Sequence, residues 1–163
     1  MTTILAEIFR HNRWANLGML DACAPLDRAQ LDTAAIGTYG SIALTLLHLA
    51  SAEGTYVARA TGEKIREWVD DEGSFPGLGA FRESLQASGR RLITLAQSEH
   101  RDRLVTYQSG GQPSTNPLSM ILTKALHHAT EHRTHVAASL TQPGIEPPDL
   151  DAWFFVHPGW TPG

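Results

Sequence analysis

The sequence has few of the features that would set it apart from ordinary soluble proteins. It contains one cysteine, Cys23, and 18% charged residues in a chain of 163 residues. A single thiol excludes an internal disulfide framework and fits a reducing compartment. No apolar run approaches the roughly 20 residues that a membrane-spanning helix needs, and the first residues, MTTILAEIFRHNRW, lack the long apolar segment of a signal peptide. We therefore expect a cytoplasmic protein with no membrane partner.

An excess of basic residues is also missing. Thirteen Lys and Arg stand against 17 Asp and Glu, a formal net charge of −4. Nucleic-acid-binding proteins usually carry a basic stripe, so we expect no nucleic-acid partner. Hydrophobic residues make up 42% of the chain, which is enough for one compact core. We predict a single domain over residues 1–163, with a proline-rich C-terminal tail from about residue 141.

Helical periodicity dominates the pattern, and no segment shows the sustained alternation of a strand. Ser41 and Asn116 are plausible N-caps, and Pro117 suits the first position of a helix. A short turn is expected from Asp27 to Leu31, and residues 106–116, TYQSGGQPSTN, are predicted as a polar loop. The four predicted helices cover residues 3–24, 41–60, 78–99 and 116–140.

The connection at residues 62–77 is longer than the roughly two to eight residues usual between neighbouring helices of a bundle. A long connection permits a crossover to a parallel neighbour. The predicted fold is therefore an all-α four-helix bundle with a long crossover between the second and third helices.

The most informative stretch is LHHATEHRTH, residues 126–135, which holds four of the eight histidines. One stripe of the last predicted helix advances by alternating steps of three and four residues, so it forms the inward seam of a bundle helix. Buried imidazoles need partners for their nitrogens, and a divalent metal satisfies several at once. The stripe comprises Leu118, Ile121, Ala125, His128, His132, His135 and Ser139.

His128 and His132 lie one helical turn apart on one face, so both can reach a single ion. His127 lies about 100° away from His128 and is expected on the flank. A third ligand must come from another helix, and His48, within LTLLHLASAE, is the candidate. Three histidines from two helices leave coordination positions open for water or substrate, as in catalytic sites. Zinc, nickel and iron are the candidate metals.

Residues 128–132 also match H-x-x-E-H, the inverted zinc-protease signature in which Glu131 would be the general base. We do not favour a protease, because Glu131 lies about 100° from His132 on the helix. That signature also needs an acidic third ligand downstream, and the tail offers only Glu146, Asp149 and Asp151. Glu131 is instead a candidate for proton transfer or for support of a ligand.

Four motifs, in this order, resemble the DinB-like superfamily of bacterial four-helix bundles, which is related to the bacillithiol and mycothiol S-transferases. They are RHNRWAN at residues 10–16, SIALTLLHLASAE at 41–53, TGE at 61–63 and HATEHRTH at 128–135. The resemblance covers essentially the whole chain. It implies a divalent metal held by His48, His128 and His132, and frequently a homodimer. The family name derives from DNA-damage inducibility and does not imply DNA binding.

The sequence departs from the family pattern after the last expected ligand. Where the family commonly continues HRGQ, this chain keeps Arg133 but has Thr134 and His135. His135 is thus a candidate fourth ligand, proton shuttle or hydrogen-bond donor to a ligand.

The resemblance implies a thiol S-transferase with a small-molecule substrate, a low-molecular-weight thiol as cosubstrate and a metal that activates the thiol. One alternative is a metal-dependent hydrolase, in which the ion activates water. Another is a non-catalytic metal-binding or stress-response module, for which His135 would complete the coordination. The last alternative is a metal-free network of hydrogen-bonded histidines.

Several other residues allow two interpretations. Trp14 and Tyr56 are candidates for substrate binding, although packing explains each as well. Asn12 is expected to face solvent or to cap and pair locally, with substrate binding as the alternative. Glu53 lies about 140° from His48 on the helix, which disfavours it as a ligand. Cys23 is interpreted as a small buried residue. Three isolated histidines are expected at the surface: His11, His100 and His157. Three aromatic residues of the tail are expected to pack against the bundle or a partner chain: Phe154, Phe155 and Trp160.

Overall fold

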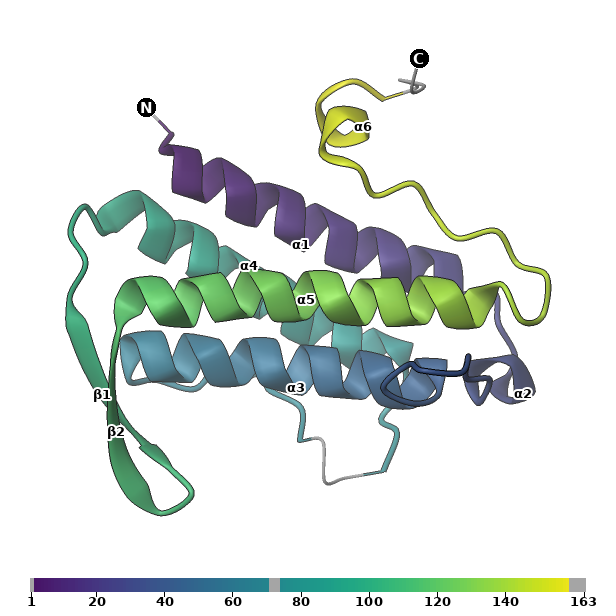
Figure 1. The fold of residues 1–163 in the computed structure, drawn as a ribbon, viewed down its shortest axis with the longest axis horizontal. Helices are drawn as coiled ribbons and strands as arrows, with labels where there is room; N and C mark the ends of the chain where they lie inside the picture. The colour runs from purple at the N-terminus through teal and green to yellow at the C-terminus, as the bar shows by residue number, and fades with distance from the viewer. Residues whose placement is uncertain (1, 71–73, 159–163) are drawn as a thin grey trace.

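The computed structural model describes residues 2–70 and 74–158, in which four long helices pack side by side (Figure 1). α1 and α3 each pack against both α4 and α5, so α1 and α3 occupy diagonal corners of the bundle. The all-α four-helix bundle is therefore confirmed. The helices are α1 (Ile4–Cys23), α3 (Ile42–Thr61), α4 (Leu78–Ser98) and α5 (Leu118–Leu140).

α3 and α4 run in the same direction, as a crossover requires. Arg91, late in α4, pairs with Glu63 just beyond the end of α3. Gly62 ends α3 with φ 81°, a left-handed conformation that favours glycine. The connection at residues 62–77 therefore joins two parallel neighbours.

Side-chain caps begin both α3 and the short helix before it. The Ser41 hydroxyl accepts a hydrogen bond from the Leu44 amide at the start of α3. The turn expected after Asp27 is a short helix, α2 (Arg28–Leu31), which begins with a reciprocal capping box between Asp27 and Gln30.

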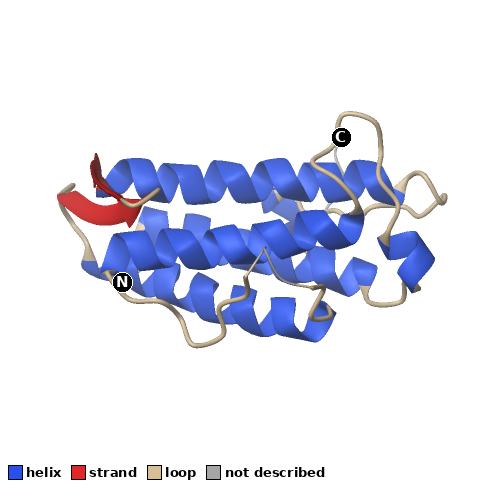
Figure 2. Cartoon of the chain, turned by 90° about the horizontal axis from the view of Figure 1, so that it is seen from below, coloured by secondary structure: helices blue, strands red, loops and turns tan. Residues whose placement is uncertain are grey.

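The polar segment before α5 is a β-hairpin, so its prediction as a loop was wrong. β1 (Leu104–Ser109) pairs antiparallel with β2 (Gln112–Pro117), at the same end of the bundle as the N-terminus (Figure 2). Gly110 and Gly111 form the two-residue turn with φ 57° and 77°, the positive values that such a hairpin turn needs. Most side chains of both strands are exposed or half-buried. The alternation that marks a strand is therefore absent.

The hairpin also moves the start of the last long helix. Asn116 lies in β2, where its side-chain amide donates to the Tyr107 hydroxyl, so it is not the predicted N-cap. The Asp102 carboxylate accepts hydrogen bonds from the Ser119 amide and hydroxyl at 2.9 and 2.7 Å. A residue distant in sequence thus satisfies the first turn of α5.

The C-terminal segment packs on α1, and it contains a helical turn that its prolines did not predict, α6 (Ala152–Val156). The rings of Phe154 and Phe155 lie 6.4 and 5.3 Å from that of Trp14. His11 shares a 2.9 Å hydrogen bond with the Leu150 carbonyl, so it is half-buried rather than a surface residue. Packing of both phenylalanines on the bundle is confirmed, and Trp160 lies outside the described residues.

The apolar core consists of two clusters, one toward each end of the bundle. Between them lies a buried polar layer, which we define as Asn12, Asn16, Glu53, Ser88 and Arg133. Cys23 is fully buried in one of the clusters, where burial raises the pKa of its thiol to about 12. Among the described helices, none combines the length and apolar character needed to cross a membrane.

Candidate metal centre

Three histidines converge where α3 packs against α5. The Nε2 atom of His128 lies 3.1 Å from the Nε2 atoms of both His48 and His132. Ligand nitrogens of the three rings lie within 4.8 Å of one another. Nitrogens around a tetrahedral zinc ion with bonds of about 2.0–2.1 Å are about 3.3 Å apart. The separations observed here therefore fit three ligands of a shared ion.

The protein environment keeps the imidazoles of His128 and His132 neutral. Burial, helped by His132 and His48, lowers the pKa of His128 to about 3. Burial, helped by His48 and His135, lowers the pKa of His132 to about 4. Both rings therefore carry a free lone pair at neutral pH, which is the form that binds metals.

Tyr39 is part of this site, and the sequence did not indicate it. Its ring stacks on His48 with centroids 4.4 Å apart and meets the ring of His132 edge-on at 5.0 Å. It comes from the loop between α2 and α3, where no helical spacing links it to the histidines. Tyr39 therefore packs against two of the three converging rings and restricts their motion.

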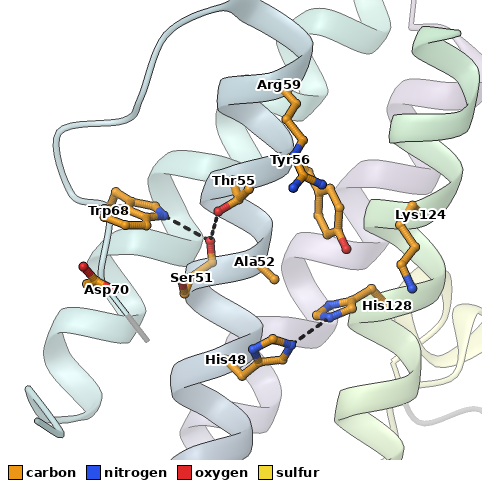
Figure 3. Close-up of a pocket in the computed structure, with 10 residues that line it drawn as sticks. All are labelled: His48, Ser51, Ala52, Thr55, Tyr56, Arg59, Trp68, Asp70, Lys124 and His128. Atoms are coloured by element: carbon orange, nitrogen blue, oxygen red, sulfur yellow. Dashed lines mark hydrogen bonds between the residues drawn. The ribbon is translucent and has the colours of Figure 1, made fainter. Parts of the chain in front are cut away.

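A cavity of about 540 Å³ opens beside His48 and His128 (Figure 3). Tyr56 lines it, with its ring edge-on to that of His128 at 5.6 Å between centroids. Trp14 does not line this cavity, because α1 is diagonal to α3 and Trp14 packs against Phe155 instead. Of the two candidate substrate-binding residues, only Tyr56 lies near the histidines.

Trp68, from the connection after α3, forms one wall of the cavity. Its Nε1 donates to the Ser51 carbonyl at 3.1 Å, as Figure 3 shows. A Cβ atom on Gly54 would lie 2.2 Å from Cδ1 of this indole. A glycine inside a helix is usually costly, and here it makes room for the tryptophan.

We expect Gly54→Ala to destabilise the protein by about 1–3 kcal/mol, because the indole must move. Gly79→Ala is the matched control, since Gly79 is also helical and a methyl group there would meet no atom within 4 Å. That change should stabilise by about 0.5–1 kcal/mol through helix propensity. Urea unfolding measures the change in the free energy of unfolding for both variants. If Gly54→Ala were to stabilise the protein as Gly79→Ala does, the close packing of Trp68 on Gly54 would be contradicted.

Behind the histidines, the polar layer connects all four long helices. Glu53 Oε2 accepts from the side-chain amides of Asn12 and Asn16 at 3.0 and 2.8 Å, and Oε1 accepts from the Ser88 hydroxyl. The amide oxygens of the same two asparagines accept from Arg133 Nη1 at 2.8 and 2.6 Å. Two asparagines one turn apart on α1 thus link a carboxylate on α3 with a guanidinium on α5.

The charges in this layer are fully enclosed. Burial raises the pKa of the Glu53 carboxyl and lowers the pKa of Arg133 to about 10. Asn12 is 0% exposed, which corrects the expectation that it faces solvent. Glu53 is not among the converging ligands, as its angular position predicted. It is instead buried and linked, through the two asparagines, to α5, the helix that carries His132. Because Arg133 directly follows His132, the layer holds α5 in register at the site.

His135 and Glu131 lie outside the converging group. The ring of His135 is 5.4 Å from that of His132 between centroids, and its Nδ1 is buried with no hydrogen-bond partner in the described part of the chain. Among residues 2–70 and 74–158, the histidines that converge are His48, His128 and His132 alone. Glu131 and His127 are exposed. The structure therefore places His135 beside a candidate ligand rather than in the ligand set.

The fold and this site define a class of protein: a helical bundle whose second and last long helices hold a three-histidine group beside a cavity that His48 and His128 line. The chain belongs to the DinB family, which its sequence matches over residues 1–161. No curated protein gives a significant match to the chain. Family membership and the histidine group are both compatible with metal binding.

Proposed function

We propose that this protein is a divalent-metal-dependent enzyme of the thiol S-transferase type. The observation that carries the proposal is the convergence of three imidazoles, His48, His128 and His132, beside a cavity that His48 and His128 line. Structural metal sites are usually closed by four protein ligands, whereas catalytic sites keep a position open. The described chain supplies three converging histidines and an adjoining space, which favours the catalytic alternative over a non-catalytic metal-binding module.

His48, His128 and His132 would hold the ion, and zinc, nickel and iron all accept imidazole ligands. When bound, a divalent ion lowers the pKa of a coordinating thiol and leaves it as a nucleophilic thiolate at neutral pH. Tyr39 keeps the His48 ring in place by stacking on it.

Tyr56 is the candidate for contact with the second substrate. Burial raises the pKa of its hydroxyl, so the group remains a hydrogen-bond donor toward negative charge that develops on the electrophile. His135 and Glu131 stay candidates for proton transfer, with His135 the better placed because it contacts His132.

The reaction joins a thiolate sulfur to an electrophilic carbon and expels a leaving group, while the thiol proton passes to solvent. We expect the metal-loaded protein to accelerate the reaction of 2-mercaptoethanol with 1-chloro-2,4-dinitrobenzene, followed by the absorbance of the thioether product. Chelated protein and the His128→Ala variant serve as controls. A rate that is the same with loaded, chelated and variant protein would contradict a metal-dependent transferase for this thiol and electrophile.

A further inference from the structure

We propose that the cavity selects an anionic thiol, whose negatively charged group is bound by Lys124 and Arg59. This inference rests on the proposed function, because it places the sulfur of the same substrate at the three histidines. Both cations line the cavity that His48 and His128 share. The chain as a whole carries a net charge of −4, so a cationic wall at this cavity opposes the overall field of the protein.

Lys124 lies one turn before His128 on α5. Figure 3 shows its ammonium and the hydroxyl of Tyr56 both directed toward the His128 ring. A cation beside a metal site repels the ion it adjoins. An anionic ligand that bridges the region between the two would offset that repulsion.

Arg59 lies three turns beyond His48 on the same face of α3. Its guanidinium carbon lies 4.9 Å from the ring centre of Tyr107 and 5.8 Å from that of Tyr56. Stacking on two aromatic rings orients the guanidinium and leaves its N–H groups available for a carboxylate. Arg59 also lines two adjoining hollows, so it stands where the cavity widens.

Neither cation belongs to an ion pair found in the described part of the chain, where those pairs involve other residues. Asp70 is the carboxylate among the residues that line the cavity. Figure 3 places Asp70 next to Trp68, on the other side of α3 from Lys124. The wall between the histidines and Arg59 therefore offers two cations and the apolar surface of Ala52 and Tyr56.

The spacing along the helices sets the length of the ligand. Four residues of α5 rise about 6 Å, and eleven residues of α3 rise about 16 Å. A short thiol acid bound through sulfur at the histidines therefore reaches the level of Lys124. A longer one extends past Tyr56 toward the side chain of Arg59, which folds back into the cavity in Figure 3.

Matched thiols test the inference on cobalt-loaded protein, through the thiolate-to-cobalt charge-transfer absorption. We titrate 3-mercaptopropionate against 3-mercaptopropan-1-ol, and 6-mercaptohexanoate against 6-mercaptohexan-1-ol. We expect each acid to bind about tenfold more tightly than its alcohol, since a charge-assisted contact contributes that much. The preference should weaken as salt is added.

Three variants locate the charge. Lys124→Gln should remove most of the preference for the short acid over its alcohol, and Arg59→Gln most of the preference for the long acid over its alcohol. Arg90→Gln removes the same charge from an exposed position on α4 and should leave both preferences intact. Lys124 is exposed and Arg59 half-buried, so neither change threatens folding.

Acids and alcohols that bind the wild-type protein equally, or preferences that survive in both variants, would overturn the inference and leave the thiol function standing. If cobalt binds but none of the four thiols produces the absorption, the thiol function itself fails, and the inference fails with it.

Discussion

Replacing His128 by alanine is expected to abolish stoichiometric binding of a divalent metal. Nε2 of His128 is the central atom of the group, at 3.1 Å from the nearest nitrogen of each of the other two histidines. Its removal leaves two ligands on different helices, and no third residue of the described chain converges with them. Loss of a supporting residue alone costs a metal site about 10–100-fold in affinity, so loss of a ligand should cost more than about 100-fold. Elemental mass spectrometry of purified wild-type and variant protein measures the change.

The neighbouring histidines provide the controls. His127→Ala removes an exposed imidazole one residue away and should retain the metal. His135→Ala should also retain it, because His135 lies outside the converging group. Added metal should raise the melting temperature of the wild type, through preferential binding to the folded state, but not that of His128→Ala. Equal metal content in His128→Ala and wild type would refute the three-histidine site, and loss in His135→Ala would make that residue a fourth ligand.

The long helices were predictable because each carries its own signal. Apolar residues recur with helical spacing, and Pro25, Gly62 and the Pro143-Gly144 pair interrupt the pattern. The predicted ends at residues 24, 60, 99 and 140 fall within one residue of the observed ends. The three converging histidines were found for the same reason, since two share one helical stripe and the third lies in an apolar helix.

The hairpin and the covering residues were not predictable in this way. The hairpin strands bury little, so no hydrophobic alternation marks them, and their pairing is set mainly by the Gly110-Gly111 turn. Tyr39 and Trp68 come from loops, and their contacts with His48 and Gly54 depend on how those loops return to the bundle. Spacing along the chain carries no information about such a return.

The polar layer escaped prediction for a different reason. Each of its residues, taken alone, belongs to a type that is usually exposed. Asn12 and Asn16 are four residues apart on one face of α1, which is a usable signal only when a buried acid and a buried base are known to face them. The partners come from α3 and α5, so the compensation exists only in the folded bundle.

Arg133→Met is expected to destabilise the metal-free protein by about 3–5 kcal/mol, the cost of leaving one member of a buried charge pair without the other. Glu53 would keep its amide and hydroxyl donors but lose the only buried cation that faces it in the described chain. Urea unfolding at neutral pH measures the loss. Arg91→Ala is the control, because Arg91 pairs with Glu63 at the surface and should cost less than about 1 kcal/mol.

The pH dependence identifies the cause of that loss. Burial already raises the pKa of Glu53, and the positive charge of Arg133 opposes the rise, so the pKa of Glu53 should rise further in Arg133→Met. A carboxyl whose folded pKa exceeds its unfolded pKa carries no penalty below the unfolded value and a growing penalty as pH rises toward the folded value. The stability deficit of the variant should therefore shrink as the pH is lowered from about 7 to about 5.

Arg133→Met combined with Glu53→Gln should recover part of the stability at neutral pH, because no buried charge then lacks its partner. A deficit that is independent of pH and unchanged in the double variant would mean that Arg133 contributes through packing, and the polar layer would then not act as a charge-compensated link between α3 and α5.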